Sequence, residues 1–257
     1  MPQAAGVSPD AYAADRGPIG ALIIHGFEGS AAETRPMGEY LAERDVTVHC
    51  PLLAGHGTRP EDLEGVRWQE WVDQVESAFS DLQARCDRLF VAGLSMGSLL
   101  TMWLGAHHPE IAGLVIMAPA VAVKNRLMWL APGLRYLVKS LPSGLMEEEV
   151  LGDPEAVNRI WCYDGHSLWG AGELYRLQQR VRRNLAAIRQ PLLIYQGRFD
   201  NWLAPEAAQI VYEGVSSTQK RLIWLEQSGH NLLVDGERET VWAQSYDWMM
   251  DIVGASA

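Results

Sequence analysis

The chain has 257 residues, of which 48% are hydrophobic and 21% are charged. This composition is typical of a globular protein and excludes an intrinsically disordered chain. The net charge of −11 excludes the excess of Lys and Arg with which nucleic-acid-binding proteins neutralise phosphates, and it disfavours an anionic membrane surface. We therefore expect no nucleic-acid partner.

The elements expected over the first 117 residues alternate between strands and helices. Short apolar runs predict strands, and helical spacing of apolar residues predicts helices. The strands are expected at 19–24, 46–49, 88–92 and 111–117, and the helices at 33–44, 68–85 and 95–107. Near-continuous apolar strands between helices are typical of a parallel sheet that is covered on both faces.

This alternation stops at about residue 120, and no strand is expected over 120–187. The acidic run Glu147, Glu148 and Glu149 predicts a solvated helix start, and residues 174–185 are expected to be helical. Because long loops without structure are uncommon, we interpret 120–187 as a helical cap over the carboxyl ends of the strands, where open α/β sheets bind ligands.

The alternation resumes after the cap. Strands are expected at 191–196 and 220–225, and helices at 205–212 and 237–252. We therefore expect an α/β core made of residues 1–119 and 188–257, interrupted by the cap at 120–187.

Location in the cell can be inferred from the cysteines and the N-terminus. Cys50, Cys86 and Cys162 are odd in number and lie far apart, which argues against a disulfide framework or a structural zinc site and favours a reducing compartment. The first 15 residues lack the basic and apolar regions of a signal peptide. No apolar run approaches the roughly 20 residues that span a bilayer, so we expect a cytoplasmic protein with no stable membrane insertion.

The clearest chemical motif is G-x-S-x-G at residues 93–97, with Ser95 at its centre. An apolar strand is expected before it and a helix after it. A strand-to-helix turn this sharp needs small residues on both sides of the serine, and it exposes the hydroxyl beside a helix N-terminus. Ser95 is therefore predicted to be a nucleophile, although a capping serine in a glycine-rich turn would give the same letters.

A nucleophilic serine needs a base and an acid, which in this kind of fold follow it in the order Ser, acid, His. His230 lies in a glycine-containing loop after the strand at 220–225, whereas His166 falls in the cap. Asp200 follows the strand at 191–196, and its competitors Asp153 and Asp164 fall in the cap. We predict that His230 is the general base and that Asp200 orients its ring.

An oxyanion hole needs two backbone N–H donors. One is expected from Met96, the residue after the nucleophile, and the other from Phe27, in the loop after the first long strand. His25 and His56 are interpreted as structural residues that hold their loops by hydrogen bonds.

These residues together resemble the α/β-hydrolase superfamily, and more closely its bacterial carboxylesterase and monoacylglycerol lipase group. The similarity rests on His25-Gly26-Phe27, Gly55-His56-Gly57-Thr58, Gly93-Leu94-Ser95-Met96-Gly97, Asp200 and Gly229-His230. The resemblance implies a serine hydrolase with a small helical cap that cleaves esters of short to medium acyl chains. It also implies Ser95, Asp200 and His230 as a triad, with Phe27 and Met96 as oxyanion donors.

Two positions bear on how far this resemblance extends. Monoacylglycerol lipases of the group use an acidic cap residue after a tyrosine to bind the glycerol hydroxyls, and Tyr163-Asp164 falls at that point. Asp164 is thus a candidate substrate-binding residue, although Asp is one methylene shorter than the Glu of the family. Ser98 stands where the family usually has glycine, and its hydroxyl is expected to cap the helix.

The function expected from these residues is hydrolysis of a small-molecule ester or monoacylglycerol through an acyl-enzyme on Ser95, without metal or organic cofactor. Related triad activities stay open: thioesterase, peptidase, C–C hydrolase and cofactor-free haloperoxidase, as does a non-catalytic receptor of small ligands. The chain is expected to be a monomer or a homodimer. The acyl pocket is expected between sheet and cap, lined by Leu127, Met128, Trp129, Leu130, Leu134 and Leu137.

Overall fold

The fold is taken from a computed structural model that describes residues 6–142 and 150–255. The helix start predicted at Glu147, Glu148 and Glu149 lies outside the described residues.

A central sheet carries the fold. Within the described residues it has seven strands in the order β1-β3-β2-β4-β5-β8-β9. The strands are β1 (Tyr12–Ala14), β2 (Ile19–Ile24), β3 (Val46–Cys50), β4 (Arg88–Leu94), β5 (Gly113–Met117), β8 (Leu192–Gly197) and β9 (Lys220–Leu225). Every neighbouring pair is parallel except β1 and β3 at the edge, which are antiparallel.

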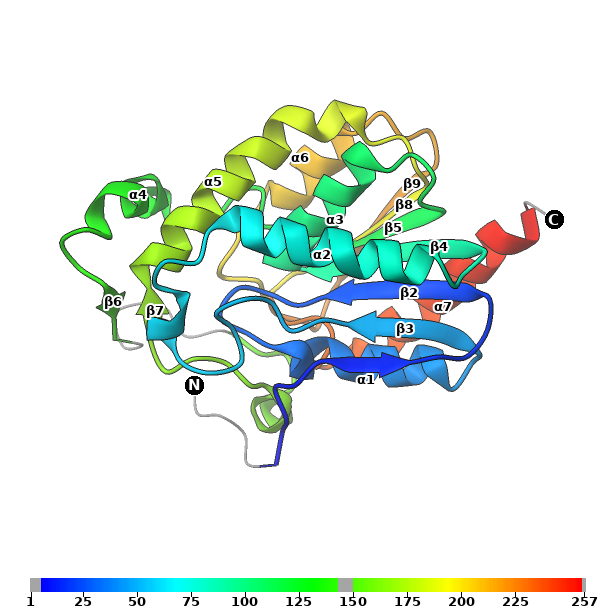
Figure 1. Ribbon diagram of the computed structural model, residues 1–257, viewed down its shortest axis with the longest axis horizontal. Helices are drawn as coiled ribbons and strands as arrows, with labels where there is room; N and C mark the ends of the chain where they lie inside the picture. The colour runs from blue at the N-terminus through cyan, green and yellow to red at the C-terminus, as the bar shows by residue number, and fades with distance from the viewer. Residues whose placement is uncertain (1–5, 143–149, 256–257) are drawn as a thin grey trace.

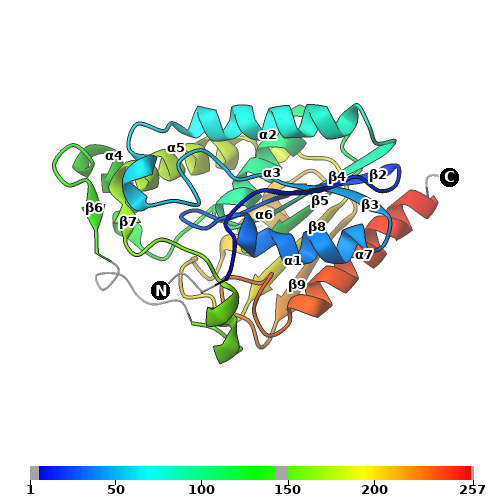
Figure 2. The ribbon, with the colours of Figure 1, turned by 60° about the horizontal axis from the view of Figure 1, so that its bottom comes forward.

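Helices cover both faces of this sheet. Helices α1 and α7 lie against one face, and α2, α3 and α6 lie against the other (Figures 1 and 2). Their bounds are α1 (Ala31–Ala42), α2 (Trp68–Gln83), α3 (Met96–His107), α6 (Ala207–Gly214) and α7 (Arg238–Ala255), with short 3₁₀ helices η1 (Pro60–Leu63) and η5 (Leu185–Ala187). Strands buried on both faces explain the continuous apolar runs at β2, β4 and β5. The expected α/β-hydrolase architecture is thus observed.

The described residues between β5 and β8 contain η2 (Arg126–Leu130), α4 (Ala131–Leu134), β6 (Ser140–Leu141), η4 (Pro154–Arg159), β7 (His166–Ser167) and α5 (Leu168–Asn184). Those around α4, β6 and β7 lie beyond the carboxyl ends of the parallel strands, where the arrowheads of β2 and β3 point, whereas α5 runs back alongside α3 (Figure 1). The expectation of no strand here was wrong, because β6 and β7 form a small antiparallel pair. Two-residue strands are too short to produce a pattern in the sequence.

Several element boundaries also differ from the sequence prediction. Helix α5 begins at Leu168 rather than at residue 174, because the Ser167 side chain caps it by accepting a hydrogen bond from the Gly170 N–H. Helix α1 begins at Ala31, after the N-cap Ser30. The edge strand β1 was not predicted, since it has only three residues. Among residues 6–142 and 150–255, no helix combines the length and apolarity that a membrane span requires.

Candidate active site

Ser95 lies at the turn between β4 and α3, in a backbone conformation that non-glycine residues rarely adopt. Its φ is 55° and its ψ is −112°, and its N–H donates to the carbonyl of Met117 on the neighbouring strand β5 at 2.9 Å. Such a strained residue persists only where its surroundings fix it. The turn predicted from the G-x-S-x-G pattern is therefore present.

The two glycines of the pattern are required by close backbone approach. A Cβ on Gly97 would lie 2.1 Å from the carbonyl oxygen of Ile24, and one on Gly93 would lie 2.2 Å from the carbonyl oxygen of Gly97. Neither position has room for a side chain. The elbow thus packs directly onto the end of β2, which brings Ser95 next to the loop that follows this strand.

The expectation that the Ser98 hydroxyl caps α3 was wrong, because its partners are the Ser95 carbonyl and the Ala120 N–H rather than an N–H of the first turn of the helix. This buried hydroxyl donates to the Ser95 carbonyl at 2.5 Å and accepts from the Ala120 N–H at 3.3 Å. It therefore joins the elbow to the first residues after β5. Glycine at this position would leave both backbone groups without that partner.

The three predicted triad side chains form one continuous line of hydrogen bonds. Ser95 Oγ lies 2.9 Å from His230 Nε2, and His230 Nδ1 lies 2.8 Å from Asp200 Oδ2. Ser95 and Asp200 lie 105 positions apart along the chain, and Asp200 and His230 lie 30 positions apart. Each of the three follows a different strand. The carboxyl ends of parallel strands meet at one edge of a sheet, which is why they converge.

Asp200 is held as an anion by its surroundings. Its side chain is 2% exposed; Oδ1 accepts hydrogen bonds from the N–H groups of Trp202 and Leu203, at 2.9 and 3.0 Å. Oδ2 also accepts from Gln196 Nε2 at 2.8 Å. Burial by itself would raise the pKa of Asp200, but the charge of His230 and these hydrogen bonds outweigh it and lower the pKa to about 2.

The loop that carries His230 is fixed by a buried carboxylate, Asp235. Its oxygens accept from the N–H groups of Gly229 at 2.7 Å, Gly152 at 3.0 Å and Asp153 at 2.7 Å. Gly152 and Asp153 belong to the cap segment, so Asp235 joins the cap to the residue just before His230. Asp235 was not among the residues predicted from the sequence, although an acid five residues after a candidate base is a visible signal.

The two predicted oxyanion donors flank Ser95. Met96 is the first residue of α3, where backbone N–H groups have no partner within the helix. Phe27 follows Gly26, and a Cβ on Gly26 would lie 3.4 Å from the Ser95 Cβ. The loop of Phe27 therefore passes against the serine.

His25 holds this loop from within. Its Nδ1 donates to the Gly26 carbonyl at 2.7 Å, and its Nε2 accepts from the Leu53 N–H at 3.1 Å. Only the neutral ring can both donate and accept. Complete burial lowers the pKa of His25 to about 4, and burial likewise places the pKa of His56 well below its usual value. His56 Nδ1 lies 3.0 Å from the Ala54 carbonyl, so each histidine makes a hydrogen bond to the loop that carries it.

A cavity of about 490 Å³ opens above Ser95 and His230, bounded by the core loops and the cap. Leu127, Met128 and Leu134 line it as predicted, together with Ala131. These residues recur at helical spacing along η2 and α4, so they share one face. Trp129, Leu130 and Leu137 do not line the cavity, and Leu137 is 83% exposed. For these three residues the prediction was wrong: apolar character alone selected them, and Leu137 lies beyond the end of α4.

Asp164 is exposed and is not part of the cavity lining, although its neighbours Tyr163 and His166 are. The acidic residues that do line the cavity are Glu28 and Glu33, which the sequence analysis did not identify as site residues. Their positions could have indicated this, because Glu28 lies in the loop after β2 and Glu33 lies in the first turn of α1, at the edge of the sheet where ligands bind. The structure therefore separates Asp164 from the residues that face the cavity.

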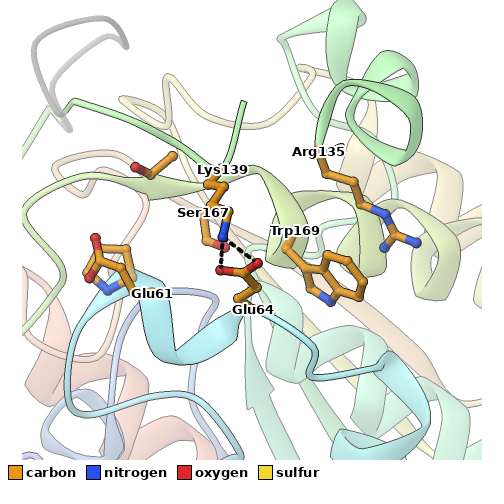
Figure 3. A pocket seen from close by; sticks show the side chains of 8 residues that line it. Glu61, Glu64, Arg135, Lys139, Ser167 and Trp169 are labelled. Atoms are coloured by element: carbon orange, nitrogen blue, oxygen red, sulfur yellow. Dashed lines mark hydrogen bonds and ion pairs between the residues drawn. The ribbon is translucent and has the colours of Figure 1, made fainter. Parts of the chain in front are cut away.

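A second, smaller crevice lies between η1 and the cap (Figure 3). Its volume is about 20 Å³, its lining includes Glu64, Lys139 and Trp169, and Ser95 does not line it. Lys139 Nζ forms an ion pair with Glu64 at 2.9 Å across it. This volume has room for little more than one water molecule, so the crevice is a contact between cap and core.

The fold and the geometry of this site define an α/β-hydrolase with a serine at its nucleophile elbow. The family described as serine aminopeptidase, S33, matches residues 20–237, and the chain belongs to this family. The resemblance to the bacterial carboxylesterase and monoacylglycerol lipase group is confirmed by the relatives that follow.

A thermostable monoacylglycerol lipase of Bacillus sp. (strain H-257) is 33% identical over 256 residues, covering 98% of each chain. A carboxylesterase of Bacillus subtilis (strain 168) is 29% identical, covering 95% of this chain and 97% of the relative. A solved structure from work on two metagenome-derived lipolytic enzymes, LipS and LipT, superposes with a TM-score of 0.89. It is 27% identical to this chain, and the match covers 95% of this chain and 98% of that one.

Proposed function

We propose that this chain is a serine hydrolase of carboxylic esters in which Ser95, His230 and Asp200 form the catalytic triad. The observation that carries the proposal is the line of hydrogen bonds from Ser95 Oγ through His230 to Asp200, at 2.9 and 2.8 Å, below an apolar cavity. Phe27 and Met96 act through their backbone N–H groups as the oxyanion donors. The chain is a carboxylic ester hydrolase, in keeping with the named activities of its relatives.

Acylation begins when Ser95 Oγ attacks the ester carbonyl and His230 Nε2 takes its proton. The Asp200 anion holds Nδ1–H in place and stabilises the imidazolium that forms. The negative charge of the tetrahedral intermediate develops on the former carbonyl oxygen, toward the N–H groups of Phe27 and Met96. Each such donor contributes about 3–4 kcal/mol to stabilising the transition state.

The intermediate collapses when His230 returns the proton to the alkoxide of the leaving alcohol, which departs and leaves the acyl group on Ser95. Water then repeats the sequence: His230 removes its proton, its oxygen attacks the acyl carbonyl, and Ser95 leaves with the proton that His230 gives back. The carboxylic acid is released and the enzyme returns to its starting state.

The substrate class follows from the cavity. Its lining is mainly apolar, with Leu127, Met128, Ala131 and Leu134 from the cap, which suits a short- to medium-chain acyl group. The alcohol is that of a simple ester or the glycerol of a monoacylglycerol. The proposed core consists of 1–119 and 188–257, and the proposed cap is 120–187. Free thiols at Cys50 and Cys86 support a cytoplasmic location. The protein acts as a monomer or a homodimer.

The test is hydrolysis of p-nitrophenyl esters from acetate to palmitate and of monoacylglycerols by the wild type, Ser95→Ala and Ser80→Ala. Ser80 is an exposed serine of α2 and serves as the matched control. We expect turnover on short and medium chains by the wild type and Ser80→Ala, and none by Ser95→Ala.

Two further measurements separate the alternatives. A fluorophosphonate that labels Ser95 in an enzyme inactive on every ester would show a working nucleophile and a wrong substrate class. Hydrolysis of amino-acid p-nitroanilides in preference to esters would favour a peptidase, which the family description names. Absence of both turnover and labelling would favour a receptor.

A further inference from the structure

The residue after Phe27 is an acid with an unusual backbone conformation. Glu28 has a φ of 61°, in the left-handed region that favours glycine because a Cβ there crowds the backbone. It is also buried, with 7% of its surface exposed. A buried carboxylate on a strained backbone persists only if its surroundings compensate for both features.

The compensation comes from one segment of the cap. The Tyr163 N–H donates to the Glu28 carbonyl at 3.1 Å. The Ser167 N–H donates to Glu28 Oε1 at 2.6 Å, and His166 Nδ1 lies 2.7 Å from Glu28 Oε2. All three partners lie more than 130 residues away in the sequence, between positions 163 and 167, at the start of α5.

The same turn of α5 also holds the side chain of Phe27. A Cβ on Gly170 would lie 2.7 Å from the Phe27 ring, so the ring packs directly against the backbone of the first turn of α5. Ser167 is the N-cap of that turn, and its side chain accepts from the Gly170 N–H. Phe27 and Glu28 are thus both fixed by the turn that begins at Ser167.

We propose that Glu28 is a positioning residue for ester hydrolysis: its contacts with Tyr163, His166 and Ser167 fix the loop on which the Phe27 N–H faces the oxyanion. The inference rests on the proposed role of Phe27. Glu28 acts through its neighbour, and the cap, besides bounding the cavity, sets the geometry of the oxyanion hole.

The acid suits this task because a carboxylate accepts at both oxygens. Burial raises the pKa of Glu28, while the hydrogen bonds from His166 and Ser167 act in the opposite direction. Aspartate at this position is one methylene shorter and cannot reach both partners. Glutamine keeps the length, accepts from Ser167 through its oxygen, and can donate through its amide to His166 Nδ1 when the ring proton is on Nε2.

The experiment compares Glu28→Gly with Glu28→Gln. Glycine adopts a positive φ without strain, so it removes the contacts of the side chain without adding backbone strain. We expect Glu28→Gly to lower kcat on a p-nitrophenyl ester about 10- to 100-fold, less than the 10²–10³-fold loss of a whole donor, with KM changed less than about threefold. Glu28→Gln is expected to restore kcat to within about threefold of the wild type, because the carboxylate's reach is preserved.

Binding of a trifluoromethyl ketone distinguishes positioning from a merely structural role. This inhibitor adds to Ser95 and places an oxyanion in the hole, so its Ki should rise by the same factor as kcat falls. The matched control is Asp45→Gly, since Asp45 has the same φ of 61° and lies in the turn before β3. It should leave both kcat and Ki unchanged.

The proposal is overturned if folded Glu28→Gly keeps wild-type kcat, or if its kcat falls while the Ki of the ketone stays constant. If Glu28→Gly does not fold, Glu28→Asp is tested in its place. It should show a lower kcat and a Ki of the ketone raised by the same factor, and wild-type values of both would overturn the inference. A wild type without esterase activity overturns the proposed function together with the inference. An active wild type with unaffected Glu28 variants overturns the inference alone.

Discussion

Replacing Asp200 by Asn tests the proposed triad through a change of one atom. The Asn oxygen can keep the hydrogen bonds from the N–H groups of Trp202 and Leu203, now at 2.9 and 3.0 Å. Its amide then points at His230 Nδ1, which is 2.8 Å from the carboxylate oxygen. Because the amide donates, Nδ1 must accept, and the proton moves to Nε2.

The consequence for Ser95 is large. With the proton on Nε2, the ring donates toward Ser95 Oγ, 2.9 Å away, and has no lone pair there to take the serine proton. The same change in a Ser-His-Asp triad lowers kcat about 10⁴-fold, which corresponds to about 5.5 kcal/mol. The fold tolerates the variant, since the unpaired buried Oε1 of Gln196 is available to accept from the new amide after the Gln196 side chain turns over.

The assay is steady-state hydrolysis of p-nitrophenyl butyrate by the wild type, Asp200→Asn and Asp81→Asn, with thermal unfolding of each. Asp81 is an exposed residue of α2 and controls for the loss of one charge. We expect kcat to fall about 10⁴-fold only in Asp200→Asn, with KM little changed. A folded Asp200→Asn that retains more than about a tenth of wild-type kcat would refute the reasoning, because tautomer control by Asp200 would then be unimportant.

Three further predictions concern the residues that support the site. In an NMR titration, His25 should have a midpoint near its depressed pKa of about 4. Because this pKa lies below the unfolded value of 6.5, the unfolded state takes up the proton first as the pH falls. The neutral ring therefore contributes about 3 kcal/mol to the free energy of unfolding above pH 6.5, and this contribution is lost as the pH falls toward 4. A midpoint at 6 or above would contradict the burial argument. Ser98→Ala should lower the free energy of unfolding in urea by about 1–3 kcal/mol, since it leaves a buried N–H unsatisfied; an unchanged value would mean that another group accepts from it. Asp235→Asn turns an amide donor toward backbone N–H groups, so it should lower the free energy of unfolding by about 2–4 kcal/mol and also lower kcat. A loss of stability with full kcat would show that Asp235 does not position His230.

Most of the core could be predicted from the sequence, because its strands and helices produce local patterns of apolar residues. Buried parallel strands produce apolar runs, and α2 repeats its apolar residues at helical spacing. The elbow around Ser95 was visible because a sharp strand-to-helix turn requires glycine at fixed offsets. The prediction failed at β1, β6 and β7, which are too short to carry a pattern, and at the start of α5, where capping by Ser167 decides the boundary.

The candidate site was predictable to a lesser depth. Ser95, Asp200 and His230 were identifiable because each follows a strand, and parallel strands end at one edge of the sheet. The lining of the cavity was only half predicted, since the orientation of Leu127 and Leu137 depends on how the cap packs.

What the sequence determined by itself was therefore the order of the elements, the nucleophile elbow and the loops that carry the other site residues, because these depend on neighbours along the chain. Only the tertiary structure decided that Glu28 and Asp235 hold the cap to those loops, and that Asp164 lies outside the cavity lining. Those contacts join residues more than 80 positions apart. Their distances and burial depend on the packing of the cap against the core, for which local periodicity carries no information.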